Sequence, residues 1–361
     1  MSSPEPSREI VVFGAAGVVG RRACELAGAR GVTRAIADAH DAAALARVFA
    51  GARVVVNATG PLRETAAPVL VAALTAGAHY VDVGGEQAVM QALYERHEST
   101  ARRAGLVALP GAGLDCMIGD LAAGWAAAHL CNVTDPGPTL RTAPAPRLAE
   151  DRPLDEVRIS YVFDELALSA GAQRALFGNV GTRPLIWRRD RWEPGVAAAA
   201  HRVNAGPAFG GERDAIAHPG GDALAIPRHV AANLVASYVS TTRRPALGAL
   251  LRLGATALSF VPRAAAELLA PYAPSDAELA RTRFAIVAQV RRGFSAAQVV
   301  VRGADVCRTT AAIVAWTARQ LAARGAGPVG MRAPGELFRC EPALRELARA
   351  ADLTIEPSFG A

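Results

Sequence analysis

Lysine is absent from the 361-residue sequence, so all 39 basic residues are arginines. Arginine stays protonated in proteins, whereas lysine can lose its proton and act as an amine nucleophile. Mechanisms that need a lysine Schiff base or a lysine acid or base are therefore excluded. The Tyr-x-x-x-Lys pair of short-chain dehydrogenases is excluded for the same reason.

Cysteine is also scarce, and the five cysteines lie far apart without a Cys-x-x-Cys pair. This spacing favours reduced thiols and offers neither a disulfide framework nor a zinc site. The N-terminus lacks an apolar signal core, and the longest apolar stretch, from Ala246 to Val261, contains Arg252 and is too short to span a bilayer. We expect a cytoplasmic protein with no metal centre and no transmembrane segment.

The formal charge of +6 does not come from a basic cluster, because the arginines are scattered singly or in pairs among acids and alanines. No basic motif interleaved with aromatic residues appears, so we expect no nucleic-acid partner. Hydrophobic residues make up 51% of the chain and charged residues 20%. A chain of this length and composition can bury a large core and is expected to form two domains.

Short apolar runs alternate with helical patterns in the first third of the chain. The runs predict strands at residues 9–13, 32–37, 53–57, 79–83 and 106–109. The patterns between them predict an alanine-rich helix up to residue 29 and helices at 41–50, 66–76 and 86–104. Such regular alternation is typical of an α/β fold with a doubly wound parallel sheet.

A glycine turn, Gly14-Ala-Ala-Gly17-Val-Val-Gly20, stands between the first predicted strand and the first predicted helix. Glycines at these points allow a tight turn, a close approach of pyrophosphate to the helix N-terminus, and close packing of the helix on the sheet. The sequence therefore predicts a Rossmann-type dinucleotide-binding fold. The expected cofactor contacts from this turn are Gly14, Ala16, Gly17, Val18 and Val19.

Asp38 follows the second predicted strand, about 20 residues after the glycine turn, at the distance typical of a ribose-binding acid. A carboxylate there accepts hydrogen bonds from the adenosine ribose and repels a 2′-phosphate, which favours NAD over NADP. In the alternative interpretation, Asp38 only marks the start of the second helix.

The pattern changes at the proline-rich segment between Asp135 and Pro146. Isolated β runs follow at residues 157–163, 185–187, 284–290 and 297–301, and they predict an α+β domain with a largely antiparallel sheet. Residues 307–323 predict a helix that returns to the first domain. We expect a dinucleotide-binding domain over residues 1–130, a substrate domain over 131–304 and a C-terminal helical segment over 305–361.

Several segments together resemble the saccharopine dehydrogenase-like oxidoreductases, a family that includes trans-acting enoyl reductases. They are Val54-Val-Val-Asn-Ala-Thr-Gly-Pro61, His79-Tyr-Val-Asp-Val-Gly-Gly-Glu86, Leu109-Pro-Gly-Ala-Gly-Leu-Asp115, Gly220-Gly-Asp-Ala-Leu-Ala-Ile-Pro-Arg228 and Val300-Val-Arg-Gly-Ala-Asp305. The resemblance is strongest over residues 1–125 and implies an NAD(P)-binding domain with an inserted substrate domain. It also implies that Ala58, Thr59, Gly60 and Pro61 border the nicotinamide.

The sequence departs from this family in one respect. Family members usually have two β-α units between the glycine turn and the Asn-x-x-Gly-Pro loop, and the first ends in an arginine-bearing turn that holds NADPH. Here there is room for one unit, and residues 32–50 resemble the second of the two. Either this strand lies beside the first strand and puts Asp38 at the ribose, or the cofactor site has been lost.

Candidate acids lie at or after the carboxyl ends of the predicted strands, at the edge where ligands bind such sheets, namely Asp82, Glu86 and Asp115. A carboxyl in a half-buried site can have its pKa raised into the range of a general acid. In the alternative, Glu86 only stabilises a helix start and Asp115 only binds amides of its glycine turn. Asp120 is either a further acid or a buried structural group, and Cys116 is expected to be a buried thiol.

In the second domain, Tyr161, Arg228 and His229 are candidates for substrate contact. The apolar segment from Leu247 to Val261 suits a lid, a dimer surface or a core helix. A lid or a dimer surface suits a small hydrophobic substrate, and a homodimer is compatible with the second of these uses. Pro227-Arg228-His229 is expected to contact an anion or a carbonyl group of the substrate.

Three functions remain open from the sequence. The first is an NAD(P)H-dependent reductase of a C=C or C=N bond in a hydrophobic secondary metabolite, with a proton from a nearby acid. The second is a non-redox cyclase or isomerase of natural-product biosynthesis that kept the fold and lost the cofactor. The third is a non-catalytic partner of a synthase.

Overall fold

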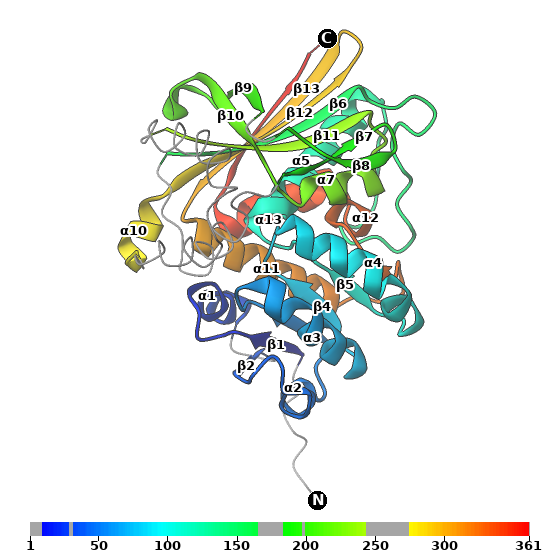
Figure 1. Cartoon of the computed structure of the whole chain (residues 1–361), viewed down its shortest axis with the longest axis vertical. Helices are drawn as coiled ribbons and strands as arrows, with labels where there is room; N and C mark the ends of the chain where they lie inside the picture. Colours follow the sequence, from blue (N-terminus) through cyan, green and yellow to red (C-terminus); the bar gives the residue numbers. More distant parts are fainter. Residues whose placement is uncertain (1–8, 29–31, 165–182, 197–198, 243–273, 361) are drawn as a thin grey trace, which may run out of the picture.

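The computed structural model describes residues 9–28, 32–164, 183–196, 199–242 and 274–360 (Figure 1). Within these ranges the chain forms two β-sheets in separate layers. The N-terminal sheet and its helices form the lower part of Figure 1, and the second sheet lies above them.

In the described part of the chain, the first sheet has six parallel strands in the order β14-β5-β4-β3-β1-β2. Their bounds are β1 Ile10–Phe13, β2 Val32–Ala35, β3 Val54–Asn57, β4 His79–Asp82, β5 Val107–Leu109 and β14 Gly330–Met331. The central strands are almost continuously apolar because both faces of the sheet are covered. The predicted doubly wound α/β fold is confirmed.

Helices cover both faces of this sheet. On one face lie α2 (Ala42–Phe49), α3 (Leu62–Thr75) and α4 (Gln87–Arg103), and on the other lie α1 (Val18–Ala27) and α11 (Val306–Ala322). Successive strand residues point to opposite faces, so Val11 packs with α2 and α3 whereas Val12 packs with the helices of the other face. The predicted strands and helices of this region all form, with ends that shift by a few residues.

Strand β2 lies directly beside β1, with Ile10 paired to Val32 and Phe13 paired to Ala35. Strand β2 therefore occupies the position next to β1, after which a Rossmann-type sheet carries its ribose-binding residue. Asp38 follows in an exposed turn, where its Oδ1 accepts a hydrogen bond from the His40 N–H at 2.9 Å. Helix α2 is capped by Asp41 through the Ala44 N–H at 2.9 Å, so Asp38 is not its N-cap.

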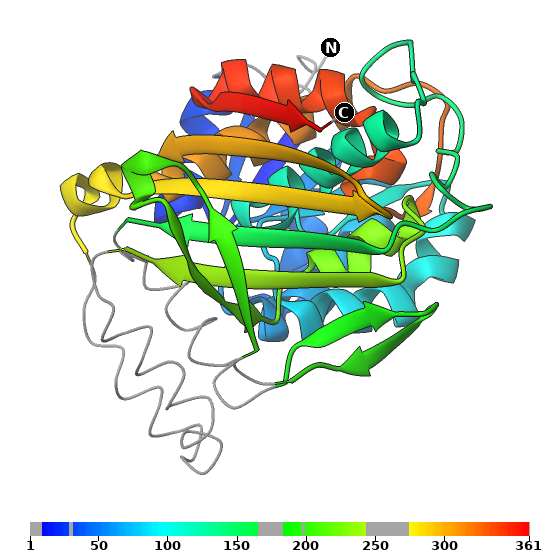
Figure 2. The ribbon, with the colours of Figure 1, turned by 90° about the horizontal axis from the view of Figure 1, so that it is seen from above.

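The second sheet has the order β15-β13-β12-β6-β11-β10-β9, and β7 pairs with both β11 and β8. Its strands are β6 Glu156–Phe163, β7 Leu185–Arg188, β8 Arg191–Pro194, β9 Ala200–Asn204, β10 Glu212–His218, β11 Leu234–Thr241, β12 Arg283–Arg292, β13 Ser295–Ala304 and β15 Thr354–Phe359. Among these described strands only β6 and β11 pair in parallel. The expected largely antiparallel sheet is confirmed, and Figure 2 shows it from above.

Helix α5 (Leu114–Leu130) lies between the two sheets and is buried around most of its circumference. A helix that is apolar on all sides is typical of a central core position. It packs closely on β6 because Gly119 has no side chain: a methyl group there would lie 2.8 Å from Ile159 Cγ2. This helix connects the edge of the parallel sheet to the core beneath the second sheet.

The C-terminal segment contributes to both layers. Helix α11 packs on the first sheet, and β14, which the sequence did not predict, extends that sheet. Helices α12 (Pro334–Leu337) and α13 (Cys340–Ala351) follow, and β15 then joins the second sheet beside β13, which the sequence did not predict.

Two further short helices are α7 (Asp222–Ala225), beneath α5, and α10 (Asp276–Arg281). The apolar segment from Leu247 to Val261 lies outside the described residues. None of the helices that the structure describes combines the length and hydropathy needed to cross a bilayer.

Candidate functional site

The glycine turn joins β1 to α1 and packs against the loop that follows β3. Gly14 has a φ of +86°, and a methyl group there would lie 2.7 Å from Thr59 Cγ2. A methyl group at Gly20 would lie 2.3 Å from the Gly14 carbonyl oxygen, so α1 approaches the strand only because both residues are glycines. Gly17 is exposed at the N-cap of α1, which has no side-chain cap and no acid in its first turn.

This geometry leaves the first N–H groups of α1 available to an anion. The positive end of the helix dipole adds to that preference. The turn therefore fits the pyrophosphate of a dinucleotide, and Gly17 lies exposed within it.

The loop after β3 carries Ala58, Thr59 and the exposed Gly60, and a cis peptide bond joins Gly60 to Pro61. Thr59 Oγ1 donates a hydrogen bond to Asn57 Oδ1 at 2.6 Å and lies 2.8 Å from Thr65 Oγ1. The Thr59 N–H also donates to Asn57 Oδ1, at 3.1 Å. These bonds fix the conformation of the loop that packs against the glycine turn, and they add Thr65, which the sequence did not single out.

A buried polar network links this loop to those after β4 and β5. Asn57 Nδ2 donates to the Tyr80 hydroxyl at 3.3 Å, and that hydroxyl donates to Asp82 Oδ2 at 3.0 Å. Asp82 Oδ1 accepts the N–H groups of Gly84 at 3.1 Å and Gly111 at 2.9 Å. Burial raises the pKa of Asp82 to about 7. With only 1% of its surface exposed, Asp82 orients three loops from within the fold.

Asp115 and Glu86 lie at the accessible side of the same edge. Solvent reaches Asp115, but surrounding protein atoms crowd its carboxyl, and this desolvation raises its pKa to about 6, with a contribution from the negative charge of Glu86. Desolvation also raises the pKa of the half-buried Glu86, whose Oε1 accepts the Leu62 N–H at 3.3 Å. A methyl group at Gly85 would lie 2.7 Å from Asp115 Cγ, so the loop after β4 packs directly on this acid.

Tyr161 lies deeper, beneath α5, and does not share the position of Asp115. Its hydroxyl lies 3.0 Å from both carboxyl oxygens of Asp222, and Ser237 Oγ donates to Asp222 Oδ2 at 2.9 Å. Burial raises the pKa of Asp222 to about 8 and that of Tyr161 well above its ordinary value. Asp222 stands in the Gly220–Arg228 motif, but the sequence did not predict a role for it; the glycine pair before it was the available signal.

His229 lies on the far side of α5, where its Nε2 is 2.8 Å from Asp120 Oδ1. Asp120 Oδ2 accepts the Gly335 N–H at 2.7 Å, and both side chains of the pair are buried. Arg228, beside it, donates to Glu336 Oε2 at 2.6 Å and to the Met331 carbonyl at 3.0 Å. These groups join the second domain to the C-terminal segment.

Cys116 is fully buried, and desolvation with the nearby carboxylates raises its thiol pKa well above the ordinary value. A neutral thiol is a poor nucleophile, so Cys116 acts as a packing residue.

The structure thus brings together the glycine turn, the Ala58–Pro61 loop, Glu86 and Asp115 at one edge of the parallel sheet. It places Asp82 beneath that edge, and Tyr161 and His229 at two other positions. Among the described residues, no group of three or more side chains is arranged to hold a metal ion.

Comparison with known proteins identifies the fold. Saccharopine dehydrogenase (L-Glu forming) from Saccharomyces cerevisiae aligns with a TM-score of 0.61, covering 98% of this chain and 100% of that chain at 12% sequence identity. An engineered D-amino acid dehydrogenase bound to NADP⁺ aligns with a TM-score of 0.42 over 93% of this chain and 95% of that chain, at 13% identity. The second value is too low to carry an argument.

In sequence, a lipid droplet localized protein from Caenorhabditis elegans is 33% identical over 86 residues, which span 24% of this chain and 20% of that protein. No family model matches the chain. The architecture, a six-stranded parallel sheet joined to a second, mixed sheet, is similar to the fold of that saccharopine dehydrogenase.

Proposed function

We propose that the protein is an NAD(H)-dependent reductase that acts on a C=C or C=N bond of a small hydrophobic metabolite. The observation that carries the proposal is the accessible glycine turn at an uncapped helix N-terminus, packed against the Thr59 loop, with β2 beside β1. These are the features by which a Rossmann-type sheet binds a dinucleotide.

The cofactor would lie along this edge. Gly14, Ala16, Gly17, Val18 and Val19 would hold the pyrophosphate, and the loop from Ala58 to Pro61 would border the nicotinamide, which supplies a hydride when bound. Asp38 keeps its Oδ2 available for a ribose diol, because its described hydrogen bond uses Oδ1. A carboxylate at this place disfavours the 2′-phosphate of NADP.

Asp115 is the proton donor of this proposal. Its pKa of about 6 means that a useful fraction stays protonated near neutral pH, and solvent can return a proton to it. Glu86 supports the protonated form of Asp115 through its negative charge. Asp82 orients the loops, because its carboxyl is occupied by two backbone N–H groups and the Tyr80 hydroxyl.

Two neighbouring carboxyls make this edge unsuitable for a substrate that carries several carboxylates. Like charges at Glu86 and Asp115 would repel such a molecule, whereas an uncharged enone or imine meets no such cost. This argues for an apolar substrate rather than a multiply charged amino acid.

A second candidate is a cofactor-independent cyclase or isomerase. The two carboxyls at the accessible edge, Asp115 and Glu86, both have raised pKa values and supply acid and base groups that need no cofactor. The shortened dinucleotide-binding region favours this candidate as well.

The two candidates differ in the origin of the transferred hydrogen. The purified protein is incubated with NADH that carries deuterium at C4 and with a panel of apolar enones and cyclic imines, and products are analysed by mass spectrometry. The reductase proposal predicts a product that contains cofactor deuterium and that is lost in Asp115→Asn. Product formation without any dinucleotide, with deuterium entering only from heavy water, would contradict it and favour the cyclase.

A further inference from the structure

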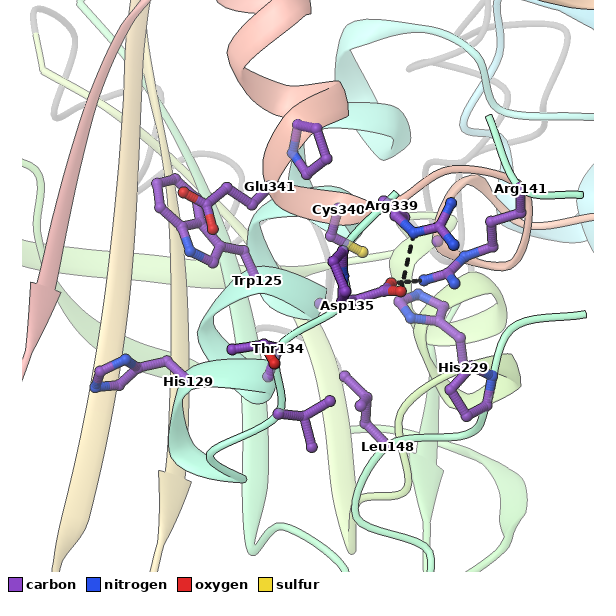
Figure 3. A pocket seen from close by; sticks show the side chains of 17 residues that line it. Trp125, His129, Thr134, Asp135, Arg141, Leu148, His229, Arg339, Cys340 and Glu341 are labelled. Atoms are coloured by element: carbon purple, nitrogen blue, oxygen red, sulfur yellow. Dashed lines mark hydrogen bonds and ion pairs between the residues drawn. The ribbon is translucent and has the colours of Figure 1, made fainter. Parts of the chain in front are cut away.

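A cavity of about 450 Å³ lies at the other end of α5, away from the glycine turn (Figure 3). It is bordered by the second half of α5, the segment that follows this helix, His229 and the start of α13. The volume falls within the range of small-molecule sites, which is about 300–1,000 Å³. None of the functions argued above uses it.

Two guanidinium groups and one carboxylate meet at one wall of this cavity, which gives that wall a local excess of one positive charge. Asp135 Oδ1 accepts from Arg339 Nε at 3.0 Å, and Asp135 Oδ2 accepts from Arg141 Nη2, so one carboxylate stands between two guanidinium groups (Figure 3). The other acid in the wall, Glu341, pairs with Arg345 at 2.9 Å. A single excess charge matches a monoanion better than a dianion.

His229 supplies a second polar group. It is 2% exposed, its Nε2 is bonded to Asp120, and no residue of the described chain partners its Nδ1. Since Asp120 accepts from Nε2, the neutral ring carries its proton there and presents Nδ1 as an acceptor. Because the His229 ring borders the cavity, a hydroxyl or N–H of a ligand can donate to this nitrogen.

The rest of the wall is largely apolar, with Trp125, Ala128, Val133 and Leu148. Cys340 also borders the cavity, but burial raises the pKa of its thiol well above the ordinary value, so the thiol is neutral. The wall therefore offers binding groups and no activated nucleophile.

We propose that this cavity is a second ligand site, for a small monocarboxylic acid with an apolar body and a hydroxyl or N–H donor. The carboxylate lies against Arg141 and Arg339, the apolar body against α5, and the donor near His229. This site does not depend on dinucleotide binding, so its test is independent of the reductase proposal.

Isothermal titration calorimetry with benzoate as the probe and benzamide as its uncharged counterpart tests the site. Benzoate is expected to bind about tenfold more tightly than benzamide, because the charge-assisted bond is absent from the amide. Ala128→Met, which fills the cavity from a half-buried position on α5, is expected to weaken benzoate binding by at least about tenfold.

Two charge variants move the affinity in opposite directions. Arg339→Gln removes the local excess of positive charge and is expected to weaken benzoate binding. Asp135→Asn increases this excess and is expected to tighten benzoate binding. A misfolded variant would not bind benzoate more tightly than the wild type. Arg191→Gln removes an exposed arginine outside the cavity and leaves the affinity unchanged. Equal binding of benzoate and benzamide, no binding of benzoate to the wild type, or a shift of the same sign in both charge variants would overturn the proposal.

Discussion

Replacing Asp222 with asparagine tests whether the buried carboxyl beneath α5 is protonated in the folded protein. Asp222 is fully buried, and it contacts the hydroxyls of Tyr161 at 3.0 Å and Ser237 at 2.9 Å. Burial raises its pKa to about 8. Asparagine has nearly the same shape and offers a neutral donor and acceptor to the same partners.

The sign of the pH effect follows from proton binding. An unfolded aspartate has a pKa of about 3.9, so between that value and the folded pKa the folded state holds one more proton. The free energy of unfolding of the wild type therefore falls as pH rises, by about 1.4 kcal/mol per pH unit. Between about pH 5.5 and 7.5 this amounts to about 3 kcal/mol, and the Asp222→Asn variant lacks this contribution.

The assay is urea unfolding of both proteins at these two pH values, followed by tryptophan fluorescence. The stability of the variant relative to the wild type should rise by about 3 kcal/mol across the interval, because other titrating groups cancel in the difference. The exposed substitution Asp151→Asn serves as the control and should show no such change. A relative stability that stays constant with pH would refute the protonated state of Asp222.

Three further predictions concern the candidate site and the contact between the domains. Gly17→Asp should abolish dinucleotide binding, because the new carboxylate would repel the pyrophosphate. The variant should lose little stability, because Gly17 is exposed. Unchanged binding in calorimetry would contradict the placement of the pyrophosphate at the glycine turn. Glu86→Gln should lower the pKa of Asp115 below about 6, because the negative charge that helps to raise this pKa is removed. Carbon NMR titration of Asp115 measures the change, and an unchanged midpoint would show that Glu86 does not influence Asp115. Gln87→Ala should lower the free energy of unfolding by about 2–4 kcal/mol, because the Gln87 amide makes hydrogen bonds to the backbone of Leu185 and Gly220. Gln91→Ala is the matched control, since the Gln91 amide makes only an exposed bond to Glu95. Equal losses of stability in the two variants would contradict the prediction.

The sequence predicted the parallel sheet well because its strands are short apolar runs between amphipathic helices, and that pattern depends on local burial. The glycine turn was equally predictable, since Gly14 and Gly20 occupy points where a side chain would meet backbone. Strand β15 was missed because Thr354–Phe359 is mostly exposed at a sheet edge and lacks an apolar face.

The positions of the candidate acids could not be predicted as fully. Asp82, Glu86 and Asp115 follow strands in the sequence, but only packing decides that Asp82 points into a buried network while Asp115 meets solvent. The pairing of His229 with Asp120 joins residues 109 positions apart. No local pattern encodes such a contact, and the same holds for the cavity formed by Asp135, Arg141 and Arg339.

The most direct test of the account is calorimetric titration of the purified protein with NADH and NADPH, after mass spectrometry has excluded carried-over nucleotide. The account predicts micromolar binding of NADH, weaker binding of NADPH by about tenfold, and loss of this preference in Asp38→Ser. Absence of binding by either nucleotide at millimolar concentrations, with the protein folded, would contradict the central claim that the glycine turn holds a dinucleotide.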